Sequence, residues 1–154
     1  MHPTMRFRGQ GLHAQHTTAV FGHPVSLVLA GEAAAADRLA VIVHRDRAAT
    51  LGIDDLAQIF LRKRRFWPGG GAIVPVNRDA MSDARAAFTR AVFGPDARRL
   101  ETYWNRQYFH GVLPPATLAS DEAVKRFVAG APNAIGYVQA AAVDDSVKVL
   151  LYLE

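Results

Sequence analysis

Polar residues with anion-binding chemistry follow an apolar run near the middle of this chain. The run covers residues 72–76, and after it come Asn77, Arg78 and, four residues beyond the arginine, Ser82. The pattern predicts that Arg78 ends a strand and that Ser82 opens a helix. A guanidinium forms forked, charge-assisted pairs with oxyanions, and the free N–H groups of a first helical turn also favour a negative charge. We therefore predict an oxyanion-binding site at this point of the chain.

The neighbours of this arginine and serine leave two interpretations open. Arg85 lies three residues after Ser82 on the same side of the expected helix, where a cation opposes the helix dipole. A bound oxyanion would offset that charge, but so would Asp83. Arg78 is either the main charge partner of a ligand or a surface arginine paired with Asp79 or Asp83. Ser82 is either a ligand-facing hydroxyl or simply the N-cap of its helix.

No set of catalytic residues can be assembled from the sequence. The chain lacks the G-x-S-x-G, H-E-x-x-H and phosphate-loop motifs, and neither His44 nor His110 has a nucleophile beside it in sequence. The remaining histidines of interest, His13, His16 and His23, do not show the spacing of metal ligands. We therefore predict a protein that is not an enzyme and that uses no metal or cofactor.

The charge of the chain is weakly basic, with a formal net charge of +4 and a sequence pI of about 9.8. Its most basic run, residues 62–65, is followed by Phe66 and Trp67, a combination that could contact nucleic acid. A single short run at a helix end is more often solvated and matched to the helix dipole, so we predict no nucleic-acid binding. The absence of cysteine excludes disulfides and fits the cytosol and the periplasm equally well.

The hydrophobic pattern predicts one α/β domain with a central, mostly parallel sheet flanked by helices. Apolar, β-branched runs predict strands at residues 39–43, 72–77, 134–138 and 147–153, and helical periodicity begins near Asp54, Ser82, Pro95 and Ser120. Residues 111–115 are expected to form a loop. The helix after Pro95 is expected to present a stripe made of Leu100, Tyr103, Trp104, Gln107 and Tyr108 at helical spacing.

The first part of the chain does not follow this pattern, so we divide the sequence into residues 1–36 and residues 37–154. The first segment combines a weakly basic start, a short apolar stretch and an alanine run at residues 34–36. It is interpreted either as an N-terminal extension or as a degenerate signal peptide. A signal peptide would place the protein in the periplasm, and otherwise its location stays open. No stretch is long and apolar enough for a transmembrane segment.

Taken in order, the motifs of residues 37–154 resemble a known family. They are D-D-L-A-Q-I-F-L at residues 54–61, Trp67, I-V-P-V-N-R at residues 73–78, Ser82 with Phe88, and N-A-I-G-Y-V at residues 133–138. This series resembles the phosphate-binding proteins of ABC transporters, which are periplasmic binding proteins with two α/β lobes. The resemblance implies a single lobe of the type 2 periplasmic-binding-protein fold. It also implies non-catalytic binding of phosphate or a similar oxyanion.

The resemblance also implies a set of site residues. Arg78 and Ser82 match the arginine and the serine that bind phosphate in that family, together with the backbone amides after the serine. The implied ligand-binding set is Asn77, Arg78, Ser82, Asp83, Ala84 and Arg85. The family continues after the serine with glycine and threonine, whereas Asp83 and Ala84 stand here. These differences place a carboxylate near the anion and remove one hydroxyl.

Partners and an alternative function follow from the same resemblance. The implied partners are inorganic phosphate and an ABC transporter permease, a sensor protein or a second copy of the chain. A lobe without its opposing lobe would leave a ligand exposed on one side, because pockets normally bury most of their ligand. The alternative is therefore an accessory or sensor interaction domain that no longer binds phosphate tightly.

Overall fold

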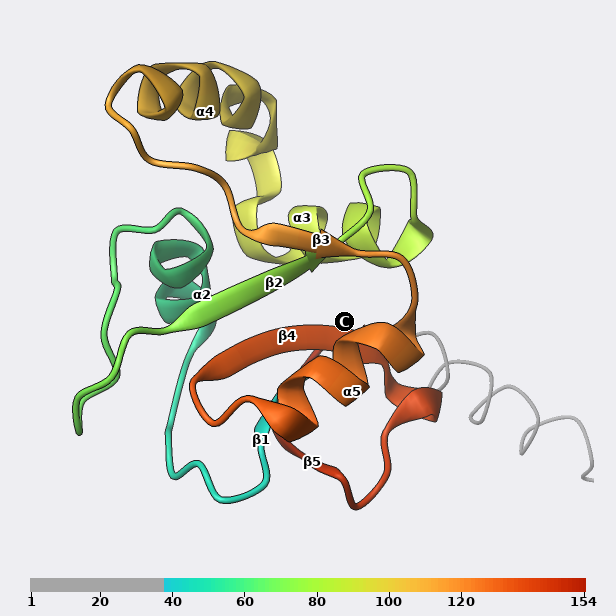
Figure 1. The fold of residues 1–154 in the computed structure, drawn as a ribbon. Helices are drawn as coiled ribbons and strands as arrows, with labels where there is room; N and C mark the ends of the chain where they lie inside the picture. The colour runs from blue at the N-terminus through green and yellow to red at the C-terminus, as the bar shows by residue number, and fades with distance from the viewer. Residues whose placement is uncertain (1–37) are drawn as a thin grey trace, which may run out of the picture.

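A five-stranded sheet lies at the centre of the computed structural model, which describes residues 38–154 (Figure 1). The strand order is β3-β2-β4-β1-β5. The strands are β1 (Leu39–His44), β2 (Val74–Arg78), β3 (Ala116–Leu118), β4 (Ala134–Gln139) and β5 (Val147–Leu153). The interpretation of residues 1–36 as an extension or signal peptide lies outside the described residues.

The sheet is mostly parallel, as predicted. Strand β2 pairs in parallel with both β3 and β4, whereas β1 pairs antiparallel with β4 and with β5. Strands β2, β3, β4 and β5 therefore all run in one direction, and β1 alone runs against them. The predicted α/β fold with a central sheet flanked by helices is confirmed. The carboxyl ends of β2 and β4 consequently meet at one edge of the sheet, where the candidate site lies.

Helices cover both faces of the sheet. They are α2 (Ile53–Phe60), α3 (Asp83–Phe93), α4 (Leu100–Phe109) and α5 (Asp121–Gly130), with short 3₁₀ turns η1 (Gly94–Arg99) and η2 (Ala140–Ala142). Residues 39, 41 and 43 of β1 belong to the core cluster that includes buried residues of α2 and α3, whereas residues 40 and 42 pack with α5. Because successive strand residues point to opposite faces and both faces are covered, residues 39–43 of β1 are all apolar.

The sequence did not predict one short strand, and it placed the start of one helix too early. Residues 116–118 form the edge strand β3, which is too short to show a two-residue period in the sequence. The helix expected after Pro95 begins as the 3₁₀ turn η1, and the following α4 buries none of its residues; Tyr108 is 67% exposed. In Figure 1, α4 stands away from the sheet. Periodicity indicates that a helix has an apolar face, but not that this face has a partner surface.

Candidate functional site

The predicted strand end and helix start meet at one edge of the sheet. Arg78 is the last residue of β2, and Ser82 is the N-cap of α3. The Ser82 hydroxyl accepts a hydrogen bond from the Arg85 N–H at 3.1 Å and donates to the Asp79 carbonyl oxygen at 2.9 Å. Ser82 therefore performs the capping role that the sequence left open, and both hydrogen-bonding capacities of its hydroxyl are used locally.

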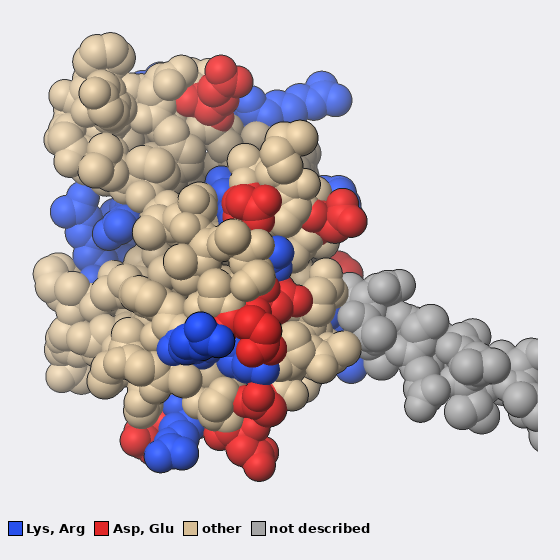
Figure 2. Space-filling view, turned by 45° about the vertical axis from the view of Figure 1, so that its right-hand side comes forward, with Lys and Arg blue, Asp and Glu red and all other residues tan. Residues whose placement is uncertain are grey.

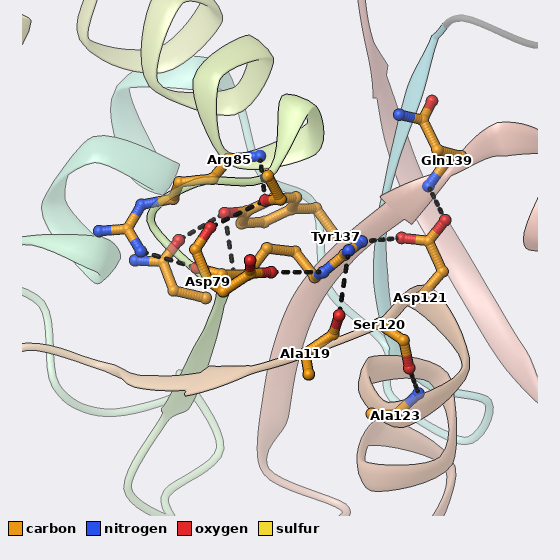
Figure 3. A network of polar contacts seen from close by, with 11 residues as sticks. Asp79, Arg85, Ala119, Ser120, Asp121, Ala123, Tyr137 and Gln139 are labelled. Carbon is orange, nitrogen blue, oxygen red and sulfur yellow. Dashed lines mark hydrogen bonds and ion pairs between the residues drawn. The ribbon is translucent and has the colours of Figure 1, made fainter.

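The side chain of Arg78 is paired with carboxylates of the protein itself (Figure 3). Its guanidinium donates a hydrogen bond to Asp121 of α5, and its Nε lies 3.8 Å from Oδ1 of Asp79. Its Nη2 lies 3.5 Å from the Ala119 carbonyl oxygen. Only 12% of the Arg78 side chain is exposed, so this pairing is partly shielded from water. An anionic group already occupies the position that a ligand of Arg78 would take.

Asp121 is held at this position by an arginine, a backbone N–H and the positive end of a helix dipole. It is the first residue of α5, behind the N-cap Ser120, whose hydroxyl accepts the Ala123 N–H at 3.0 Å. One carboxylate oxygen accepts from Arg78, and the other lies 3.4 Å from the Gln139 N–H at the end of β4. The positive end of the α5 dipole adds to these contacts. Asp121 therefore acts as an internal anion for the site.

The sequence reasoning missed Asp121 and expected Asp79 or Asp83 as the protein's own partner for Arg78. Asp79 does lie beside Arg78, whereas Asp83 is exposed and pairs with no cation among residues 38–154. Asp121 is separated from Arg78 by 43 positions, and only the crossing of α5 beside β2 and β4 brings the two together. The only sequence signal was an acidic residue directly after the N-cap Ser120.

The other members of the implied set lie in different environments. Arg85 folds back over the end of β2 and donates from Nη1 to the Arg78 carbonyl oxygen at 2.7 Å. The side chain of Ala84 is buried in the core, so only its backbone faces the helix terminus. Asn77 is also buried, and its Oδ1 accepts a hydrogen bond from the Tyr137 hydroxyl at 2.5 Å. Asn77 therefore braces β2 through Tyr137.

Tyr137 connects the core to this edge of the sheet. Its ring is fully buried, and its hydroxyl donates to Asn77 and accepts the Arg78 N–H at 3.2 Å. Burial raises the pKa of Tyr137 to about 12, although the hydrogen bond from the Arg78 N–H and the charges of Arg85 and Arg78 act in the opposite direction. The neutral phenol thus fixes the backbone that carries Arg78.

The high pKa of Tyr137 predicts a loss of stability in alkaline solution. Tyrosine ionises near pH 10.0 in the unfolded chain and near pH 12 in the fold, so the unfolded state binds fewer protons between these values. The free energy of unfolding should therefore fall as pH rises through this window, by up to about 3 kcal/mol. Urea unfolding at several pH values should show a shallower fall for Tyr137→Phe. An equally steep fall in that variant would exclude Tyr137 as the source.

No group of three or more His, Cys, Asp or Glu side chains among residues 38–154 is placed to hold a metal ion. None of the helices within these residues has the length and apolar character needed to cross a membrane.

The fold matches solved structures of phosphate-transport proteins. An ABC-type phosphate transport receptor from Vibrio cholerae matches with a TM-score of 0.59 and 21% identity, covering 74% of this chain and 45% of that chain. PstS from Borrelia burgdorferi matches with a TM-score of 0.59 and 19% identity, covering 74% of this chain and 46% of that chain. A Clostridium perfringens protein described as a phosphate ABC transporter substrate-binding protein, with bound phosphate, has a TM-score of 0.57 and 29% identity.

This chain has the periplasmic-binding-protein fold. The C. perfringens match covers 74% of this chain and 44% of that chain, so the lobe described here spans less than half the length of each of these three proteins. The resemblance to phosphate-binding proteins that the motifs indicated is thus supported by the fold. Neither a scan against protein-family models nor a search of curated protein sequences gives a match.

Proposed function

We propose that this periplasmic-binding-protein lobe binds phosphate or a similar oxyanion without chemical conversion, at the edge formed by the end of β2 and the start of α3. The observation that carries the proposal is that Arg78 ends β2 four residues before Ser82, the N-cap of α3, while the Arg85 guanidinium lies at the Arg78 carbonyl oxygen. Guanidinium groups and first-turn N–H groups are the protein groups best suited to oxyanions.

Donors remain at this edge after the internal contacts are counted. The first turn of a helix has N–H groups without intrahelical acceptors, and the Ser82 hydroxyl accepts only that of Arg85. Within the described residues, the N–H groups of Asp83 and Ala84 make no hydrogen bond. Nε of Arg78 is buried and donates no hydrogen bond within residues 38–154. These donors support an oxyanion as the ligand class.

The internal carboxylates should make this binding weak. A phosphate that contacts Arg78 must displace or share the charge of Asp121, and it approaches Asp79 and Asp83 as well. Like charges this close repel one another, most strongly where water is partly excluded. We therefore propose an affinity lower than that of a site without Asp121, with the Arg78–Asp121 pair as the competing state.

A second candidate function is favoured by the same ion pair. If Asp121 satisfies Arg78 permanently, the lobe serves as an accessory or sensor interaction domain that does not bind phosphate tightly. The fold resemblance suggests an ABC transporter permease, a sensor protein or a second copy of the chain as the partner. It also suggests a periplasmic location.

Removing the competing carboxylate should strengthen phosphate binding. Asp121→Asn keeps the shape of the side chain but removes its charge, so phosphate no longer competes with a carboxylate for Arg78. A charge-assisted pair contributes about 1.5–3 kcal/mol, and partial exposure reduces this to roughly tenfold in affinity. Isothermal titration calorimetry with inorganic phosphate at neutral pH and low salt measures the change, and Arg78→Ala should abolish binding.

Glu122→Gln is the matched control for this experiment. It removes a carboxylate from the same first turn of α5, but Glu122 pairs with Lys125 at 2.8 Å and makes no contact with Arg78. Its phosphate affinity should equal that of the wild type. Binding only by Asp121→Asn would favour the interaction-domain function for the wild type. A failure of both proteins to bind phosphate would contradict the proposed site.

A further inference from the structure

A second basic feature lies near the beginning of β2, at the end opposite Arg78. It is a groove of about 620 Å³ between the turn after α2 and the segment after α4. Its polar lining comes from Arg62, Arg64, Arg65 and His110, and its apolar lining includes Phe66 and Leu113. We call it the arginine groove. Figure 2 shows basic side chains gathered in a hollow at the left edge of the molecule, beneath the region of α4.

The positive charge of the arginine groove is only partly compensated by the protein. No aspartate or glutamate lines it. Arg64 pairs with Asp55 at 3.1 Å, outside the lining. Arg62 and Arg65 form no ion pair within residues 38–154, and Arg65 donates from Nε to the Arg62 carbonyl oxygen. A concave surface with two uncompensated guanidinium groups attracts an anionic occupant.

The backbone of Arg62 indicates that this arginine has a role beyond ending α2. Its φ is 60°, and it is the only residue other than glycine with a positive φ in the described part of the chain. Glycine is the usual residue at such a position after a helix, because a side chain there is strained. Its Nε is also buried without a hydrogen-bond partner among the described residues. Strain of this kind is common at binding sites, where the side chain has a function.

The apolar lining narrows the class of occupant. Phe66 and Leu113 are 64% and 62% exposed, on the two segments that form the groove. A small inorganic anion would leave these side chains in water. A nucleic-acid strand needs a basic track along several phosphates, whereas these arginines lie within four consecutive positions beside one groove. A peptide with acidic and apolar side chains satisfies both parts of the lining.

We propose that the arginine groove docks an acidic peptide segment of a partner protein. Carboxylates of that segment pair with Arg62 and Arg65, and an apolar side chain packs between Phe66 and Leu113. The proposal does not depend on phosphate binding, because Arg78 and Asp121 lie at the other end of β2. Charge-assisted, forked pairing gives the arginines their affinity for carboxylates, and the apolar contact excludes water around them.

A short synthetic peptide that alternates glutamate and phenylalanine tests the proposal with the full chain. Titration followed by nuclear magnetic resonance should show binding, with shifts centred on residues 62–66 and 110–113. The double variant Arg62→Gly, Arg65→Gln should weaken binding by roughly tenfold or more. Arg62→Gly relieves the strain of the left-handed backbone at residue 62. This substitution should therefore not lower the free energy of unfolding. Arg126→Gln, which removes an exposed charge from α5, is the matched control and should bind as the wild type does.

Each alternative occupant has an outcome that would overturn the proposal. The same peptide with lysine in place of glutamate should not bind, and equal binding would show that charge is not recognised. Tighter binding of oligothymidine than of the acidic peptide would identify a nucleic-acid surface. Self-association of the wild type that Arg62→Gly abolishes would identify a second copy as the occupant. Peptide-induced shifts centred on Arg78 and Asp121 would place the interaction at the other end of the strand.

Discussion

Replacing Phe88 with alanine should lower the free energy of unfolding by about 3–5 kcal/mol, the largest effect expected for a single change in this fold. The Phe88 side chain is 1% exposed. Its ring stacks on that of Tyr137 with centroids 3.9 Å apart and an interplanar angle of 3°, and it contacts Phe60 at a centroid distance of 4.6 Å. Truncation would remove both aromatic contacts and leave a cavity between α2, α3 and the sheet.

The Phe88→Ala substitution should also loosen the candidate site. Tyr137 holds Asn77 and the Arg78 backbone through its hydroxyl, so a loosened ring would weaken the support of both. Urea unfolding followed by circular dichroism measures the stability, and amide resonances of residues 77–79 report the site. Phe127→Ala is the control, because Phe127 is 40% exposed on α5 and should cost about 1 kcal/mol or less. A similar cost for both variants would contradict the assigned core.

Gly136→Ala should cost about 2–3 kcal/mol, although it adds only one methyl group. An added Cβ would lie 2.7 Å from Cγ1 of Val124 and 2.9 Å from Cγ2 of Val76. Both valines are fully buried, and their branched side chains have little rotameric freedom. The methyl group would therefore push α5 away from β2 and β4. Since α5 carries Asp121 to Arg78, this change should also weaken that ion pair.

A double-mutant cycle separates the steric cause from other effects. Val124→Ala removes the atom closest to the added methyl group, so the combined Gly136→Ala, Val124→Ala variant should lose less stability than the sum of the two single variants. Urea unfolding of all four proteins gives the coupling energy. Gly69→Ala is the control, because a Cβ at Gly69 would meet no atom within 4 Å and its φ is not in the left-handed region. Simple additivity in the cycle would show that the close contact does not govern the cost.

The sequence predicted those parts of the fold that depend on neighbours along the chain. The β-branched apolar run of β1 and the helix starts near Ser82 and Ser120 were identified correctly, although the capping role of Ser82 was left open. Strand alternation, capping and helical periodicity act over a few residues, so they can be recognised without the tertiary structure. The Arg78 and Ser82 pair was placed correctly at a strand end and a helix start for the same reason.

The tertiary structure decided which groups meet. The pairing of Arg78 with Asp121 depends on how α5 packs on the sheet, and the exposure of α4 and the arginine groove depend on how α4 stands away from it. These separations along the chain leave no periodic signal. The sequence by itself predicted an α/β domain and an oxyanion-binding pattern at the end of β2. Only the three-dimensional structure showed that a carboxylate of the protein already holds the arginine, because an ion pair depends on distance in space and not along the chain.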